Sequence, residues 1–268
     1  MSARVLKSFM ENEDLAIIVL SCDRFSSLWP LFFKRYEQYF CYDFANVYLL
    51  SNHLDFKQEG KQRVAVRGVG EDVSWSSNLR RMLETINEPN LLLLMDDAPF
   101  SSSVELNRFR VIYAQFKSRA MNYINLKASP SPDKSVNDEF GELAPGTGYR
   151  AALVPSLWKK TTLLRLLKDD ESAWQFEVHG SARSNVFGGF YSINHALFEF
   201  DHIVIKGKID RRVFRKLMHA GEHKGLDFPV MTYSEFVIER IGRIRSKVIN
   251  CVLPNAIKSQ LRRIKYGH

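Results

Sequence analysis

Short apolar runs alternate with helix-like spacing over the first hundred residues. The run at 15–21 is continuous, as is typical of a strand covered on both faces. Between the runs, apolar residues recur at the helical interval, as in Leu79, Met82, Leu83 and Ile86. Strands that alternate with helices predict a mostly parallel, doubly wound sheet. The predicted strands are 15–21, 47–50, 62–67 and 91–95, and the predicted helices are 26–40 and one that Ser76 or Ser77 caps.

After residue 100 the pattern is less regular. A polar loop over 128–148 contains several Pro and Gly, and a loop of this length is usually functional or disordered. Thr232 and Glu235 form a capping box for a helix that runs to about Val252, and Pro254 begins a last basic helix. We therefore expect an α/β domain over 1–235 and a helical tail over 236–268. The other predicted helices are 104–117, 156–168, 172–183 and 210–220, and the other strands are 122–126, 149–154 and 198–205.

Composition adds few constraints. The 268 residues, 45% hydrophobic and 25% charged, suit one globular domain with an appendage. No apolar run approaches the ~18 residues that cross a bilayer, and the first residues lack the pattern of a signal peptide. Cys22, Cys41 and Cys251 are odd in number and widely spaced, which suits a reducing cytoplasm. We expect a cytoplasmic protein.

Basic charge is concentrated at the C-terminal end. Of the 38 Lys and Arg, eight lie in residues 240–268, which contain no Asp or Glu. The other 239 residues hold 30 basic and 30 acidic side chains, so the whole net charge of +8 lies in the tail. A neutral body with a basic end indicates local docking on an anionic surface, and we expect no nucleic-acid partner.

The apolar residues of the tail recur at helical spacing beside this charge. Such helices suit an anionic membrane interface, where each basic residue contributes up to about 1 kcal/mol. The alternative is that the apolar faces pack on the body or on a second subunit. The apolar positions are Val237, Ile241, Ile244, Val248 and Val252, followed by Ile257, Leu261 and Ile264.

Two adjacent carboxylates, Asp96 and Asp97, directly follow the apolar run at 91–95. The end of a buried parallel strand brings them to the carboxyl edge of the sheet, where open α/β sheets bind ligands. Carboxylates this close repel each other unless a cation or hydrogen bonds intervene. Mn²⁺ or Mg²⁺ fits, because both prefer oxygen ligands and are often shared with a phosphate. The alternative is a strand that leaves the sheet through acidic loop residues.

Several short motifs follow one another in a particular order. Ile-Ile-Val-Leu-Ser-Cys-Asp (17–23), Trp-Ser-Ser-Asn-Leu (75–79) and Leu-Met-Asp-Asp (94–97) come first. A Trp-Lys segment (155–160) and a Trp-x-x-Glu segment (171–183) come later. This order resembles the donor half of a GT-A glycosyltransferase, and is similar to glycosyltransferases of bacterial lipopolysaccharide and capsule loci. The resemblance covers roughly residues 15–210 and rests on the order of loose motifs.

The resemblance implies a GT-A-like, Rossmann-like fold that binds a nucleotide-diphosphate sugar. Ser21 and Asp23 would face the base and ribose, and Trp75 and Asn78 would belong to the same site.

Of the acidic pair, Asp96 would contact the ribose or the metal, and Asp97 would ligate the metal that bridges the diphosphate. The family pattern is Asp-x-Asp, whereas these two are adjacent. The departure leaves open which Asp holds the metal and whether a metal is needed.

Sugar transfer also needs a base, because an acceptor hydroxyl is a poor nucleophile; a positioned carboxylate is typically worth ~10²–10⁴-fold in rate. Glu177 is our candidate, since Trp174 and Phe176 beside it would desolvate it and raise its pKa. Its spacing to Arg183 resembles the corresponding segment of inverting GT-A enzymes. The alternative is that Glu177 is a solvated helix carboxylate. The rival bases are Glu171 and Asp170.

A third cluster lies at 202–208. His202 resembles the late metal ligand of some GT-A enzymes, and we expect Lys206 or Lys208 to reach the diphosphate, whose growing charge a cation must stabilise. The alternative for His202 is a hydrogen-bonded role on a strand.

The resemblance implies a metal-dependent, inverting glycosyltransferase acting on a glycan or lipid-linked glycan of bacterial lipopolysaccharide, O-antigen or capsule. The basic tail predicts that it is peripheral on the inner face of the cytoplasmic membrane. A sugar-phosphate nucleotidyltransferase uses a related sheet but usually has a Gly-rich loop after the first strand, and residues 21–27 contain no Gly. A non-catalytic membrane or nucleic-acid adaptor that uses the basic tail is the other alternative.

Overall fold

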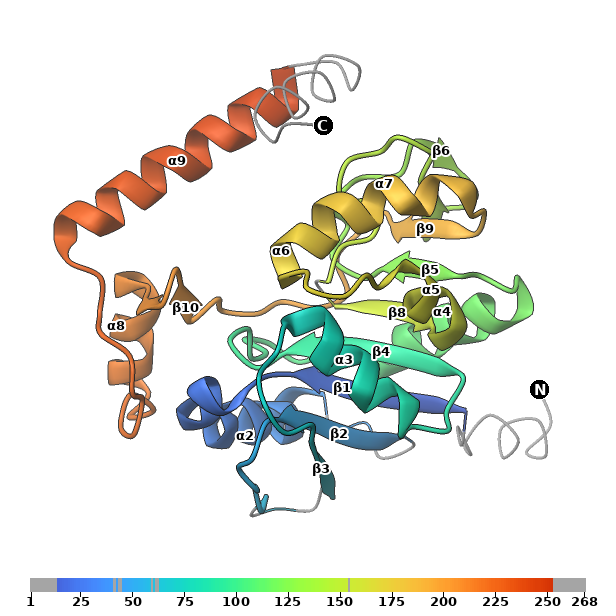
Figure 1. Cartoon of the computed structure of the whole chain (residues 1–268). Coiled ribbons are helices and arrows are strands. Elements are labelled where there is room, and N and C mark those ends of the chain that lie inside the picture. Colours follow the sequence, from blue (N-terminus) through green and yellow to red (C-terminus); the bar gives the residue numbers. More distant parts are fainter. Residues whose placement is uncertain are drawn as a thin grey trace.

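A mixed sheet forms the centre of the computed structural model (Figure 1). The structure describes residues 14–40, 42, 45–58, 60, 63–153 and 155–252, with side chains as far as 242. The order of its strands is β3 (Val64–Gly68), β2 (Asn46–Ser51), β1 (Leu15–Leu20), β4 (Asn90–Met95), β8 (Ser156–Lys159), β5 (Tyr123–Asn125), β9 (Phe190–Ile193), β7 (Phe140–Glu142) and β6 (Lys134–Ser135).

Within the described part of the chain, only β7 and β8 run against the other strands of this sheet. The predicted α/β fold, a mostly parallel Rossmann-like sheet flanked by helices, is therefore confirmed. Its helices are η1 (Asp23–Leu28), α2 (Trp29–Tyr39), α3 (Trp75–Glu84), α4 (Leu106–Ser118), α5 (Lys160–Leu166), α6 (Ala173–Gln175), the π-helix η2 (Phe176–Gly180), α7 (Ser181–Arg183), η3 (Ser184–Val186), α8 (Arg211–His219) and α9 (Tyr233–Val252).

The register of the parallel strands fixes where loops meet. Val19 of β1 lies opposite Leu49 of β2 on one side and Leu94 of β4 on the other. The carboxyl ends of these three strands therefore reach the same edge of the sheet. All six residues of β1 are buried, as the continuous apolar run predicted.

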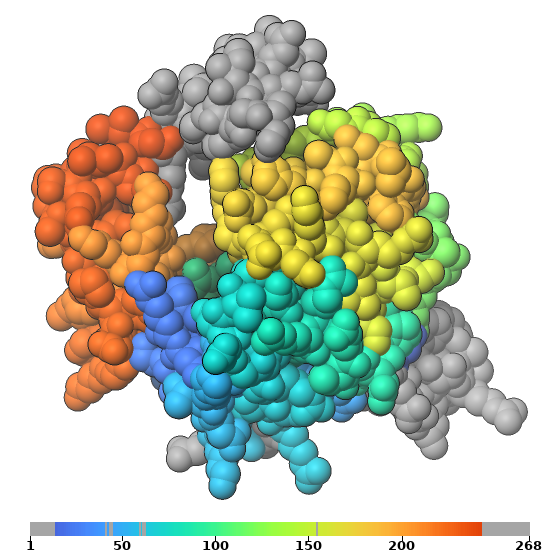
Figure 2. Space-filling view, viewed as in Figure 1, coloured from blue at the N-terminus to red at the C-terminus, as the bar shows by residue number. Residues whose placement is uncertain are grey.

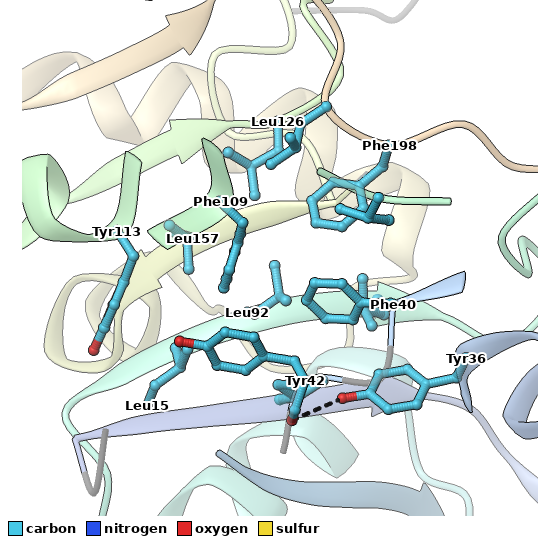
Figure 3. Packing of buried hydrophobic residues seen from close by; sticks show 14 of the residues in the cluster. Leu15, Tyr36, Phe40, Tyr42, Leu92, Phe109, Tyr113, Leu126, Leu157 and Phe198 are labelled. Atoms are coloured by element: carbon cyan, nitrogen blue, oxygen red, sulfur yellow. Dashed lines mark hydrogen bonds between the residues drawn. The ribbon is translucent and has the colours of Figure 1, made fainter. Parts of the chain in front are cut away.

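Helices cover both faces of the sheet. On one face α2 and α4 pack against β1, β2 and β4; Figure 3 shows Phe40 and Phe109 from these helical segments close to Leu92 of β4. On the other face α3, α5 and η2 pack against the alternate residues of the same strands. Burial on both faces explains why β1 and β4 carry apolar residues at every position.

A smaller unit follows the main sheet. The antiparallel pair β10 (Val204–Ile205) and β11 (Lys208–Ile209), together with α8, packs Ile203 and Leu217 against Leu28 at the end of η1. The predicted capping box of α9 is confirmed, because Thr232 and Glu235 exchange backbone-to-side-chain hydrogen bonds of 2.9 and 3.3 Å. No helix among the described residues is long and apolar enough to cross a membrane.

Four details of the predicted elements were wrong. Residues 149–151 form a turn instead of a strand, and the predicted helix at 156–168 begins with strand β8. Leu157 and Trp158 belong to the cores on opposite faces of the sheet, which requires extended backbone. In the predicted strand at 198–205, only Val204–Ile205 form a strand (β10), and Phe200 makes an isolated bridge to Phe100. Ser74, rather than Ser76 or Ser77, caps α3 by accepting the Ser77 amide at 3.1 Å. The helix predicted after Pro254 lies outside the described residues.

Trp158 offers a test of this packing. Its side chain is fully buried, with its ring 4.5 Å from that of Tyr123. We expect Trp158→Ala to lower the free energy of unfolding by about 3–5 kcal/mol, because the cavity cannot close between the sheet and the helices that cover it. Trp174, which is 46% exposed, is the matched control, and its replacement by Ala should cost about 1 kcal/mol or less. Urea denaturation measures both, and equal losses would contradict this packing.

Candidate functional site

A pocket of about 230 Å³ lies at the carboxyl edge of β1, β2 and β4. Five of the predicted site residues line it: Ser21, Trp75, Asn78, Asp96 and Asp97. Figure 2 shows the molecule hollowed where the blue η1, the teal α3 and the yellow α6 meet, beside the orange C-terminal segments. The sheet register and the first turn of α3 therefore bring these side chains together, although Ser21 and Asp97 are 76 positions apart in the sequence.

Asp96 is held in a buried hydrogen-bond network. Its carboxylate accepts a hydrogen bond from the Ser21 hydroxyl, whose oxygen accepts the Trp29 indole N–H at 2.7 Å. Burial raises the pKa of Asp96 well above its ordinary value, and the neighbouring charge of Asp97 adds to the effect. Asp96 thus links the ends of β1 and β4 and forms part of the pocket wall.

Asp97 differs from its neighbour. Its Oδ1 atom is buried and has no hydrogen-bond partner among the residues that the structure describes. Burial raises the pKa of this carboxyl to about 6, although the hydrogen bond from its own backbone amide lowers the pKa in part. An acceptor left unpaired in a pocket wall costs free energy that a bound ligand can recover.

Asp97 suits a divalent cation as one of several ligands. Across the described residues, no group of three or more His, Cys, Asp or Glu is arranged to hold a metal ion. Mg²⁺ is commonly bound through one or two carboxylates together with substrate phosphates, and does not need a cage made only of protein. The residues present therefore suit an ion that arrives with a phosphate-bearing substrate.

Asn78 supplies a second unpaired acceptor to the pocket. Its side-chain N–H donates to Asp72 Oδ1 at 2.7 Å, which fixes the orientation of the amide, and its Oδ1 is buried without a hydrogen-bond partner in the described structure. The Trp75 ring lies 5.4 Å from that of Phe176 and also lines the pocket. Asp72 was missed by the sequence reasoning, although it lies two residues before Ser74, the cap of α3.

Phe25 and Cys22 also line the pocket and were missed as site residues. Both lie directly after β1, Cys22 before η1 and Phe25 within it, so their position close to Ser21 was the available signal. Phe25 packs on Phe228 at 5.2 Å, which joins this wall of the pocket to the small C-terminal unit.

Glu177 lies one helical turn beyond Ala173, which lines the pocket. Its Oε1 accepts the backbone amide of Leu153 at 2.8 Å. Burial raises the pKa of Glu177, while the Leu153 hydrogen bond and the charge of Lys127 oppose this rise. The structure therefore contains a half-buried carboxyl with a raised pKa next to the pocket, in the helix where the sequence placed the base.

No protein-family model matches the chain, and no curated protein matches it. Among solved structures, S. aureus TarS 1–349 aligns over 67% of this chain with 10% identity and a TM-score of 0.42. The same fragment in complex with UDP-GlcNAc aligns over 90% of this chain and 76% of its own, with 10% identity and a TM-score of 0.45. UTP-bound UGPase from Acinetobacter baumannii aligns over 80% of this chain and 95% of its own, with 10% identity and a TM-score of 0.49.

The match spans only 60% of the TarS 1–349 structure and 41% of a longer TarS structure. With TM-scores below 0.5, these likenesses carry no argument about function, so the site has to be interpreted from its own residues.

The remaining predicted residues lie in structural pairs. Asp23 accepts backbone amides of Asn52 and His53 at 2.8 and 2.9 Å and so joins the loops after β1 and β2. Glu171 is buried and accepts two hydrogen bonds from Arg183, at 2.7 and 2.6 Å. Burial raises the pKa of Glu171, but the hydrogen bonds and positive charge of Arg183, together with the contact to His179, lower it by more. The pKa of this carboxyl is therefore lowered.

The residues of the predicted cluster at 202–208 contact two different parts of the protein. His202 Nε2 lies 3.4 Å from the Lys127 ammonium, within hydrogen-bond distance. Lys206 and Lys208 point toward α9 instead, where they form ion pairs with Glu239 and Glu235 respectively. The hairpin thus places its lysines on the C-terminal helix, and neither lines the pocket described above.

Proposed function

We propose that the chain is a glycosyltransferase that binds a nucleotide-diphosphate sugar in the pocket at the carboxyl edge of β1, β2 and β4. The observation that carries this proposal is the buried Oδ1 of Asp97, which has no hydrogen-bond partner among the described residues. It shares the pocket wall with Asp96 and with the Asn78 Oδ1, which is likewise unpaired in this part of the chain. An anionic diphosphate does not bind beside carboxylates without a cation, so the proposal includes Mn²⁺ or Mg²⁺ held by Asp97. When bound, that cation would stabilise the negative charge that grows on the leaving diphosphate.

The nucleoside part of the donor suits the wall formed by α3. The Asn78 acceptor would receive an N–H or O–H of the base or ribose, and the Trp75 ring offers an apolar face to pack against. Ser21, placed between Asp96 and Trp29, would complete this side of the site.

Glu177 is the base in this proposal. The acceptor hydroxyl loses its proton to the Glu177 carboxylate as its oxygen attacks the anomeric carbon, and the bond from that carbon to the diphosphate breaks, inverting the configuration. Glu171 is less suited to this role, because its carboxylate is ion-paired with Arg183 and has a lowered pKa.

We further propose that the acceptor is a glycan or lipid-linked glycan of the bacterial surface, reached at the inner face of the cytoplasmic membrane. The order of the sequence motifs and the concentration of the whole net charge of +8 in residues 240–268 support this proposal.

A thermal-shift screen of nucleoside diphosphates and their sugars, with and without Mn²⁺, tests the donor site. We expect at least one nucleoside diphosphate to raise the melting temperature in the presence of Mn²⁺, and much less in its absence. A screen in which no common nucleotide shifts the melting temperature would remove the basis of the proposal.

The charge of Lys127 should set the pH at which Glu177 becomes active as the base. Glu177 is faced by the Lys127 ammonium, the Leu153 amide and the Tyr123 phenol, whose own pKa is affected by Glu177. The rate should rise with pH as Glu177 loses its proton. Because the Lys127 charge lowers the pKa of Glu177, Lys127→Met should move this acid limb of kcat/KM to higher pH. Lys224→Met, at an exposed lysine, is the control and should leave the limb unmoved. A limb unchanged in Lys127→Met would exclude this electrostatic role.

A further inference from the structure

One face of α9 is fixed to the body of the protein. Glu239 forms an ion pair with Lys206 at 2.9 Å, and Glu235 forms one with Lys208. Both lysines belong to the β10–β11 hairpin, which packs with α8 against the end of η1. Figure 1 shows α9 set apart from the sheet, with β10 and α8 near its start. These ion pairs therefore define which side of the helix faces the hairpin.

The other side of α9 is apolar and exposed. Tyr233 and Ile241 each lie two positions from one of the paired glutamates, about 160° around the helix. The exposed fractions are 71% for Tyr233, 69% for Ile238 and 60% for Ile241. Ile238 lies at the edge of this side, about 60° from Glu235. Tyr233 and Ile241 are thus two large apolar side chains that are exposed and turned away from the body contacts of the helix, and they mark an interaction surface.

The charge of the chain decides what this surface fits. The body before residue 240 is electrically neutral, while residues 240–268 carry eight basic and no acidic side chains. An apolar helix face followed by basic residues matches the boundary between the headgroups and acyl chains of an anionic bilayer. The sequence continues the apolar spacing of this face at Ile244 and Val248.

We infer that the outward face of α9, with Tyr233 and Ile241, docks on an anionic lipid bilayer. The inference deepens the proposed function, since it names the surface that brings the enzyme to a membrane-associated acceptor. The inference rests on the proposed function only for the role of the docking, because lipid and nucleotide are bound by separate residues.

Vesicle co-sedimentation of the full-length chain tests the inference. The probes are vesicles of phosphatidylcholine alone and of phosphatidylcholine mixed with phosphatidylglycerol, at low and high salt. The variant is the double substitution Tyr233→Ser with Ile241→Ser. Val186→Ser is the matched control, because Val186 is an apolar residue of the body that is 85% exposed.

We expect binding to the anionic vesicles only, weakened by salt, and reduced about tenfold or more in the double variant but not in Val186→Ser. Unchanged binding by the double variant would overturn the inference. The inference would also be overturned if the wild type bound no vesicles but formed a dimer in analytical ultracentrifugation, and the double variant were a monomer. Tight binding of RNA in place of lipid would overturn it as well.

Nucleotide thermal shifts, measured on the same proteins, separate this inference from the proposed function. A normal Mn²⁺-dependent shift without vesicle binding would overturn only the docking surface. Vesicle binding without any nucleotide shift would instead overturn the donor site and leave the docking surface standing.

Discussion

Replacing Glu177 by Gln should lower kcat by about 10²–10⁴-fold, because the amide cannot take the proton of the acceptor hydroxyl. The amide still accepts the backbone N–H of Leu153, which lies 2.8 Å from the Glu177 carboxylate, so the local fold should persist. Donor affinity should change little, since Glu177 does not line the pocket that holds Asp97. A sugar-transfer assay with a soluble acceptor analogue, with KM for the donor measured alongside, checks this result.

Two comparison variants sharpen that experiment. Glu84→Gln changes an exposed helix carboxylate and should leave the rate unaltered. Glu171→Gln removes a buried partner of Arg183, so it should lower the melting temperature while the folded fraction retains its activity. If Glu171→Gln abolished turnover without loss of stability and Glu177→Gln did not, Glu171 would be the base instead.

Replacing Asp97 by Asn should remove the Mn²⁺-dependent stabilisation by nucleotide and lower the transfer rate by about a thousandfold. A carboxylate-bound cation contributes several kcal/mol to the stabilisation of a leaving phosphate, which corresponds to a factor of this size. The variant protein should be folded, and even slightly more stable, because the buried unpaired oxygen of Asp97 no longer carries a charge.

Asp138→Asn, at an exposed carboxylate away from the pocket, is the control for this substitution and should behave as the wild type. The thermal shift and the steady-state rate are measured for both variants. Full Mn²⁺-dependent stabilisation in Asp97→Asn would show that Asp97 does not hold the cation.

The sheet could be predicted where burial on two faces produces continuous apolar runs. β1 and β4 were predicted for this reason, and their ends correctly placed Asp96 and Asp97 at the sheet edge. β8 was missed because four residues, with Leu157 and Trp158 facing opposite layers, cannot be told from the first turn of a helix by spacing alone.

The same distinction holds for the site. Ser21, Trp75 and Asn78 lie in loops and first turns whose position follows from the order of the strands, so sequence motifs located them. The partners of Asp23 and of the hairpin lysines lie 29 or more and 27 or more positions away. Such pairings depend on how loops and the C-terminal unit come together, which local patterns do not determine.

A crystal structure of the protein with Mn²⁺ and a nucleoside diphosphate, measured at a wavelength where manganese scatters anomalously, tests the central claim most directly. We expect one manganese peak at bonding distance, about 2 Å, from a carboxylate oxygen of Asp97 and from the diphosphate, with the nucleoside against Trp75 and Asn78. A nucleotide bound elsewhere, or bound in this pocket with Asp97 contacting neither metal nor phosphate, would contradict the account.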